Sequence, residues 1–124
     1  MELKASIESI KCVYPDKKLT GIFMPHLYSR TRDLADSFAQ SLSMLDEAIL
    51  LPIYPAREQP IPGVTSELVA RDIRPGVFRG VVSMKEVPQL IDRIADSVEV
   101  LVTVGAGDLD NLADYIAERL GREL

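Results

Sequence analysis

The sequence predicts an α/β fold in which a three-layer, doubly wound and mostly parallel sheet carries helices on both faces. Two observations favour it. Helical and strand patterns alternate along the chain, and the strand segments include short apolar runs typical of buried strands. This alternation indicates crossover units on a parallel sheet. At 124 residues the chain is expected to form one domain, residues 1–124.

Apolar periodicity marks the elements of the first half. Residues 2–13 are expected to be helical, with a stripe at Leu3, Ile7, Ile10 and Tyr14. Residues 18–25 form an apolar run closed by a proline, as in a buried strand. The next helix is expected from Ser29, with Ser29 or Thr31 as N-cap, and 47–54 is the second strand. Its stripe is Leu34, Phe38, Leu42 and Leu45, and Asp33 lies in its first turn.

The middle of the chain contains a loop and a second set of elements. Residues 54–64 hold three prolines and a glycine and are expected to be a loop. A short helix over 65–74, capped by Thr65, and a strand over 77–83 follow. A capping-box pattern, Ser83 with Glu86, then opens another helix. Its inward positions are Val87, Leu90, Ile91 and Ile94.

The final strand and helix complete the alternation. Residues 98–104 are rich in β-branched side chains and indicate a strand. The segment 105–108 leads into the last helix, which has Asp108 as N-cap and Gly121 as its stop. The stripe of that helix is Leu109, Leu112, Ile116 and Leu120.

Composition excludes several classes of protein. The net charge of −5 argues against a nucleic-acid binder, and no apolar run approaches the ~20 residues of a membrane span. The first residues lack the apolar region of a signal peptide. The single cysteine, Cys12, cannot form an internal disulfide and is expected to be a small, partly buried residue. Together these features favour the cytoplasm.

Basic side chains are concentrated at the junction between the first predicted strand and the helix that follows it. The only histidine, His26, follows that strand, and Arg30 and Arg32 open the helix. Ligands bind at the carboxyl ends of strands in open parallel sheets, and a helix start adds N–H groups. The residues therefore predict an anion site for a carboxylate or a phosphate. Asp33 and Asp36 favour a solvated surface role for Arg32, and His26 either touches a ligand or is merely exposed.

Other site motifs are incomplete or absent from the sequence. The stretch "VGAGDLD" resembles part of a dinucleotide fingerprint, but Asp110 stands where a third glycine is needed. Its glycines either admit a nearby substrate or form a tight turn into a helix. The sequence has no phosphate-binding loop of the G-x-x-x-x-G-K-[ST] type, no G-x-S-x-G elbow and no zinc spacing. No complete catalytic set and no metal site are expected in this chain.

Several motifs carry a family resemblance over essentially the whole chain. "IFMPHLYSRTRDLADSFAQSL", "LLPIYPARE", "GVTSE" and "VTVGAGD" occur in the order and spacing of the Mur ligase C-terminal domain, a Rossmann-like fold of peptidoglycan synthesis. The chain most resembles the members that join L-alanine to UDP-N-acetylmuramate. The resemblance implies an enzyme of cell-wall biogenesis, cell shape, cell division and the cell cycle in the cytoplasm. It also implies that the N-terminal UDP-substrate domain and the central ATPase domain are absent from this chain.

The resemblance implies a division of labour. The central domain would bind ATP and Mg²⁺ and phosphorylate the muramate carboxylate, and L-alanine would attack the acyl phosphate. The C-terminal domain would hold the amino acid and close the active site, without a cofactor of its own and inactive in isolation. His26 and Arg30 match positions expected at the amino-acid carboxylate. Gly105, Ala106 and Gly107 match the strand end that lines the same pocket.

The chain departs from the family pattern at two positions. Leu27 stands where many members have an arginine, and Pro52 replaces a common aspartate. Arg57 and Glu58 are expected only to shape their loop, as an Arg–Glu pair. Two other functions stay open. The chain is a stand-alone, non-catalytic α/β module that binds a small anion, or it is part of a ligase for a different amino acid.

Overall fold

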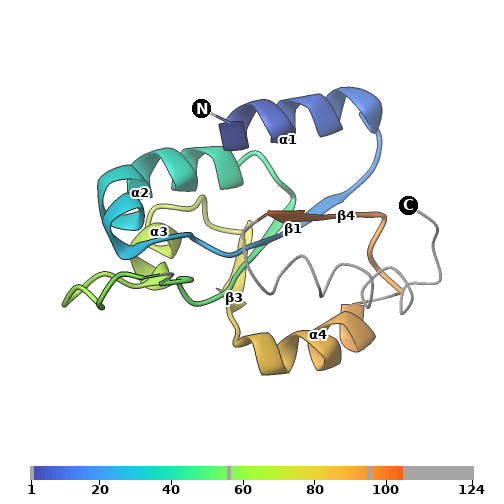
Figure 1. Ribbon diagram of the computed structural model, residues 1–124. Helices are drawn as coiled ribbons and strands as arrows, with labels where there is room; N and C mark the ends of the chain where they lie inside the picture. Colours follow the sequence, from blue (N-terminus) through green and yellow to red (C-terminus); the bar gives the residue numbers. More distant parts are fainter. Residues whose placement is uncertain (1, 56, 95, 105–124) are drawn as a thin grey trace.

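A parallel sheet forms the centre of the molecule (Figure 1). The computed structural model describes residues 2–55, 57–94 and 96–104. Its strands are β1 (Leu19–Phe23), β2 (Glu47–Leu50), β3 (Phe78–Val81) and β4 (Val100–Val104). They pair in the order β3-β2-β1-β4, and every pairing is parallel. The predicted α/β fold with a parallel sheet is therefore confirmed.

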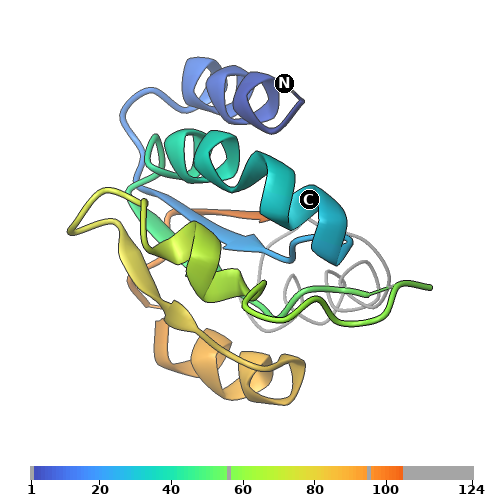
Figure 2. The ribbon, with the colours of Figure 1, turned by 90° about the vertical axis from the view of Figure 1, so that its left-hand side faces the viewer.

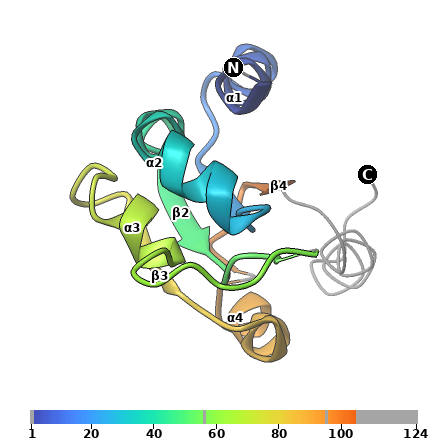
Figure 3. The same cartoon turned by 60° about the vertical axis from the view of Figure 1, so that its left-hand side comes forward.

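Helices cover both faces of this sheet. They are α1 (Glu2–Val13), α2 (Tyr28–Leu42), α3 (Ser66–Ala70), a 3₁₀ turn (Met84–Glu86) and α4 (Val87–Ile94). Figures 1 and 3 show α1, α2 and α3 on one face and α4 on the other. The described part of the chain thus has the three layers of a doubly wound fold.

Two apolar clusters, one on each face, make the core. Phe23 and Leu50 pack with α1, α2 and α3, whereas Ile22 and Ile49 pack with Val87 and the rest of α4. Successive residues of a strand point to opposite faces, so each central strand contributes to both clusters. The burial of both faces explains why these strands are continuous apolar runs.

Two residues at the end of α1 differ from expectation. Tyr14 lies beyond the last helical residue and is 45% exposed, so it does not extend the buried stripe of Leu3 and Ile7. Cys12 is exposed rather than partly buried. It lies five residues after Ile7, which rotates it by roughly 140° around the helix, away from the buried face.

Helix α2 begins one residue earlier than predicted. Leu27 is its N-cap, so neither Ser29 nor Thr31 takes that position. The Thr31 hydroxyl instead donates to the Leu27 carbonyl oxygen at 2.7 Å, inside the helix. Asp33 lies outside the first turn and pairs with its neighbour Arg32.

Later boundaries match the expected elements with small differences. Strand β2 ends at Leu50, four residues short of the predicted end, because Pro52 lacks the N–H that a ladder needs. Thr65 is the N-cap of α3, although its side chain makes no capping hydrogen bond. The capping box of Ser83 and Glu86 is present and opens the 3₁₀ turn before α4. The predicted last helix and its caps lie outside the described residues.

Gly21 is a close-contact position in central strand β1. A Cβ atom added there would lie 2.5 Å from Cδ1 of Leu45. Gly21→Val is therefore expected to overpack the core and to lower the free energy of unfolding by about 1–3 kcal/mol, measured by urea denaturation. In the double variant with Leu45→Ala, the loss should be smaller than the sum of the two single losses, since the leucine no longer fills that space. Additive losses would contradict the proposed contact.

Candidate functional site

The strand order places one switch point beside β1. The chain passes from β1 to β2 on one side, while β4 pairs on the other side. Ligands in such sheets bind where the strand order reverses, at the carboxyl ends. Phe23 and Val104 are paired there, and the Met24 N–H donates to the Val104 carbonyl oxygen at 2.9 Å. The segment that follows β1 therefore starts at the edge where a site is expected.

Backbone pairing between the first two strands continues past their ends. The Leu51 N–H donates to the Phe23 carbonyl oxygen at 2.9 Å. Further along, the Tyr54 N–H donates to the Pro25 carbonyl oxygen at 2.8 Å, and the Leu27 N–H donates to the Tyr54 carbonyl oxygen at 2.9 Å. The connection from β1 to α2 is thus held by backbone hydrogen bonds to the segment after β2.

His26 lies in the middle of this hydrogen-bonded connection. It forms an isolated parallel bridge with Tyr54, and the two rings are stacked with centroids 5.7 Å apart and planes inclined by 23°. The residue is exposed, and its ring nitrogens make no hydrogen bond to the residues that the structure describes. Tyr54 therefore orients the imidazole, and within the described ranges no group competes with a ligand for its nitrogens.

The two arginines of α2 have different environments. The exposed Arg32 pairs with Asp33, with Nε 2.9 Å from Oδ1, and the carboxylate raises the pKa of Arg32 while the guanidinium lowers the pKa of Asp33. The predicted surface role of Arg32 is confirmed. Arg30 is also exposed, but within the described ranges it has no hydrogen-bond or carboxylate partner. Among the described residues, therefore, no ion pair has to break before its guanidinium can bind an anion.

A carboxylate of the chain itself occupies the start of α2. The Ser29 N–H donates to Oε1 of Glu58 at 3.1 Å, and the Ser29 hydroxyl donates to Oε2. The helix start is therefore not a vacant set of donors for a ligand, as the sequence had suggested. Glu58 does not pair with Arg57, so the expected Arg–Glu pair is wrong.

These contacts change the acidity of Glu58. Hydrogen bonds from the side chain and then the backbone of Ser29 lower its pKa, with smaller contributions from the Tyr28 backbone and the charge of Arg32. Sequence reasoning missed the contact because the partners are 29 residues apart. The only local signal is Leu27, which has no side-chain acceptor and cannot cap the helix that it precedes.

Leu27 carries backbone strain at the same place. Its φ is 70°, a left-handed value that no other non-glycine residue shows within the described ranges. Such a conformation costs of order 1–3 kcal/mol and persists where neighbouring contacts enforce it. Here the Leu27 N–H donates to Tyr54, and its carbonyl oxygen accepts from the Thr31 N–H at 3.1 Å. The strained turn redirects the chain between His26 and Arg30.

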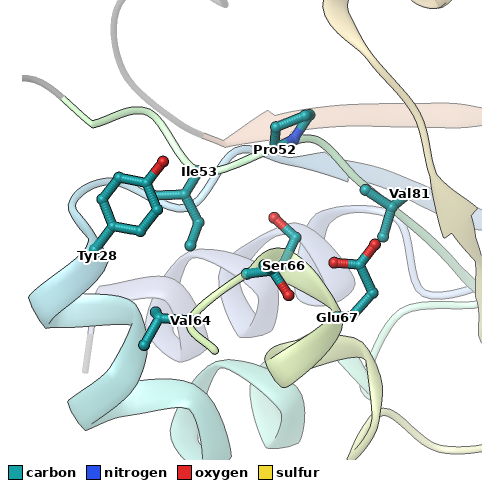
Figure 4. A pocket seen from close by; sticks show the side chains of 8 residues that line it. Tyr28, Pro52, Ile53, Val64, Ser66, Glu67 and Val81 are labelled. Carbon is teal, nitrogen blue, oxygen red and sulfur yellow. The ribbon is translucent and has the colours of Figure 1, made fainter. Parts of the chain in front are cut away.

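A small cavity lies beside this segment, at the carboxyl ends of β2 and β3 (Figure 4). Its volume is about 220 Å³, and it is lined by Tyr28, Pro52, Ile53, Val64, Thr65, Ser66, Glu67 and Val81. The buried Ser66 hydroxyl donates to the Leu51 carbonyl oxygen, so it is already satisfied. Figure 4 shows the Tyr28 ring and the Glu67 carboxylate at opposite sides of the cavity.

Gly105, Ala106 and Gly107 lie outside the described residues. Among the residues that are described, no group of three His, Cys, Asp or Glu side chains could hold a metal ion. No helix in that part of the chain has the length and apolar character needed to cross a membrane.

Comparison with known proteins gives relatives that include several ligases of the same name. The chain is 50% identical over 122 residues to UDP-N-acetylmuramate–L-alanine ligase of Phocaeicola vulgatus, a match covering 98% of the chain and 26% of the relative. The ligase of the same name from Parabacteroides distasonis is 48% identical over 99% of the chain and 26% of the relative. That of Paenarthrobacter aurescens is 41% identical over 97% of the chain and 26% of the relative. No family model matches.

These identities extend over nearly the whole chain. The chain is homologous to UDP-N-acetylmuramate–L-alanine ligases. The resemblance inferred from the motifs is thereby confirmed. The chain spans about a quarter of the length of the ligases that it matches.

The capping carboxylate of Glu58 should make stability depend on pH. Because its pKa is lowered in the folded chain, its contribution is complete above the unfolded value and is lost as pH falls through the folded value. Glu58→Gln, which cannot bind the proton, is therefore expected to be less stable than the wild type at pH 7 and to approach it at pH 3. Urea unfolding at both values measures the difference. Glu67→Gln, an exposed glutamate, is the control for charge removal.

A stability difference between wild type and Glu58→Gln that stays the same at pH 7 and pH 3 would contradict the capping role. If the stability difference between wild type and Glu67→Gln changed with pH by the same amount, the effect would be due to net charge instead.

Proposed function

We propose that this chain is the amino-acid-binding, C-terminal part of a cytoplasmic, ATP-dependent ligase that joins L-alanine to UDP-N-acetylmuramate in peptidoglycan synthesis. The observation that carries the proposal is the 50% identity to such a ligase over 98% of the chain. The exposed side chains of His26 and Arg30, which follow the carboxyl end of β1, support it. In this proposal the other three quarters of the ligase bind ATP, Mg²⁺ and the UDP-linked substrate.

The Arg30 guanidinium is suited to the carboxylate of the amino acid. A guanidinium presents two parallel N–H donors that match a carboxylate, and His26 offers a further donor nearby in sequence. Gly105, Ala106 and Gly107 would line the same pocket, as the resemblance implies. Held by its carboxylate, L-alanine keeps its amino group at the other end for reaction.

Positioning is the contribution of this chain to the reaction. The amine nitrogen attacks the carbonyl carbon of the muramoyl phosphate, a C–N bond forms, and the tetrahedral intermediate expels phosphate while the nitrogen loses a proton. A bound and oriented amine reacts as if at a very high local concentration. Closure of this part over the remainder of the ligase would bring the amine to the acyl phosphate and exclude water.

A chimaeric enzyme tests the proposed function. Replacing the aligned quarter of the Phocaeicola vulgatus ligase by this chain should give ATP-dependent formation of UDP-N-acetylmuramoyl-L-alanine, measured by phosphate release and mass spectrometry. The 124-residue chain alone should give none. A folded chimaera that hydrolyses ATP without forming product, or that uses another amino acid in preference, would overturn the proposal. A stand-alone anion-binding module would give this result.

Arg30→Ala in the chimaera tests the carboxylate contact. Losing a charge-assisted hydrogen bond costs about 1.5–3 kcal/mol, so the KM for L-alanine should rise about ten- to a hundred-fold while the KM for ATP stays nearly constant. Steady-state kinetics with each substrate varied separately measure both values. Arg74→Ala is the control, because this exposed arginine precedes β3 at the amino-terminal edge of the sheet. An unchanged KM for alanine would remove Arg30 from the site.

A further inference from the structure

The loop after β2 is attached to the start of α2 by more than its backbone. Figures 1 and 2 show this loop leaving the sheet beside the first turn of α2. At its near end Tyr54 stacks on His26 and bonds to the backbone on both sides of it. Four residues further on, the Glu58 carboxylate accepts both donors of Ser29, the residue before Arg30. The loop therefore contacts the neighbours of both candidate ligand-binding side chains.

Glu58 is the charged anchor of this loop. The turn from Pro55 is closed by the Glu58 N–H, which donates to the Pro55 carbonyl oxygen at 2.9 Å. Since Leu27 provides no side-chain cap, Glu58 also replaces the missing N-cap acceptor of α2. One side chain thus fixes the loop and the helix start to each other.

We propose that Glu58 is a positioning residue for amino-acid binding, acting on His26 through the Tyr54 stack and on Arg30 through Ser29. The inference rests on the proposed function and deepens it. Glu58 touches neither substrate nor reacting atoms in this proposal. It holds His26 and Arg30 in fixed relative positions across a turn that contains the strained Leu27, which would otherwise be free to relax.

The chain offers a matched control in Glu86. This glutamate also accepts the N–H and the hydroxyl of a serine at a helix start, from Ser83 at 3.1 and 2.9 Å. Its link spans three residues, however, and it caps the segment before α4 on the opposite face of the sheet. Glu58→Ala and Glu86→Ala therefore both remove a cap, but only the first releases the loop at His26 and Arg30.

The experiment uses two readouts. In the chimaeric ligase, Glu58→Ala should raise the KM for L-alanine on the order of tenfold with little change in the KM for ATP, because misplacing a positioning group weakens ligand contacts. Glu86→Ala should leave both unchanged. In the 124-residue chain, the imidazole proton signals of the single histidine should move in Glu58→Ala as the Tyr54 ring current changes, and should stay in Glu86→Ala.

Glu58→Gln guards against a variant that fails to fold. Its amide oxygen can still accept the Ser29 N–H. The KM for alanine and the imidazole signals of Glu58→Gln should therefore lie between those of the wild type and those of Glu58→Ala. An alanine KM and imidazole signals that remain at wild-type values in Glu58→Ala would overturn the inference, as would equal changes in Glu86→Ala.

The outcomes for Arg30 and Glu58 separate the two proposals. If Arg30→Ala raises the alanine KM and Glu58→Ala does not, the positioning role is wrong and the proposed function stands. If the imidazole signals respond to Glu58→Ala but the unmutated chimaera folds and forms no UDP-N-acetylmuramoyl-L-alanine, the link from Glu58 to His26 is supported while the proposed function is overturned.

Discussion

The structure depends on the position of β1, which has a paired strand on each edge and an apolar cluster on each face. A strand in this position can leave none of its backbone groups unpaired, because water does not reach them. Its carboxyl end must therefore emerge between the ends of β2 and β4. The residues after it, through His26, enter the one place in the described sheet where the strand order reverses.

Helix positions followed from the apolar period of their buried faces, and strand positions followed from short apolar runs, because the central strands are buried on both faces. The predictions that were wrong have equally local causes. Tyr14 has the apolar spacing of α1 but lies beyond its last residue. Cys12 lies on the exposed side of the helix, away from the apolar stripe. Strand β2 ended at Leu50, two residues before Pro52, which lacks a backbone N–H donor.

The candidate site could be predicted only in part. The location of the cations followed from topology, since parallel strands share one carboxyl edge. Which groups engage each other did not follow, because the Glu58 carboxylate reaches Ser29 across 29 residues and nothing in either local sequence specifies the other. Equally, the Tyr54 stack on His26 depends on a bridge that continues after β2 has ended.

The occupation of the α2 start by Glu58 changes how an anion would be held. A helix N-terminus is a fixed donor set, whereas arginine and histidine side chains are mobile and lose conformational freedom on binding. With the Ser29 donors engaged by Glu58, a ligand carboxylate at the proposed site would depend mainly on the side chains of Arg30 and His26 and on what orders them. In the proposed amino-acid site, the Tyr54 stack would reduce that entropy loss for His26, and the contact of Glu58 with Ser29 would fix the backbone from which Arg30 extends.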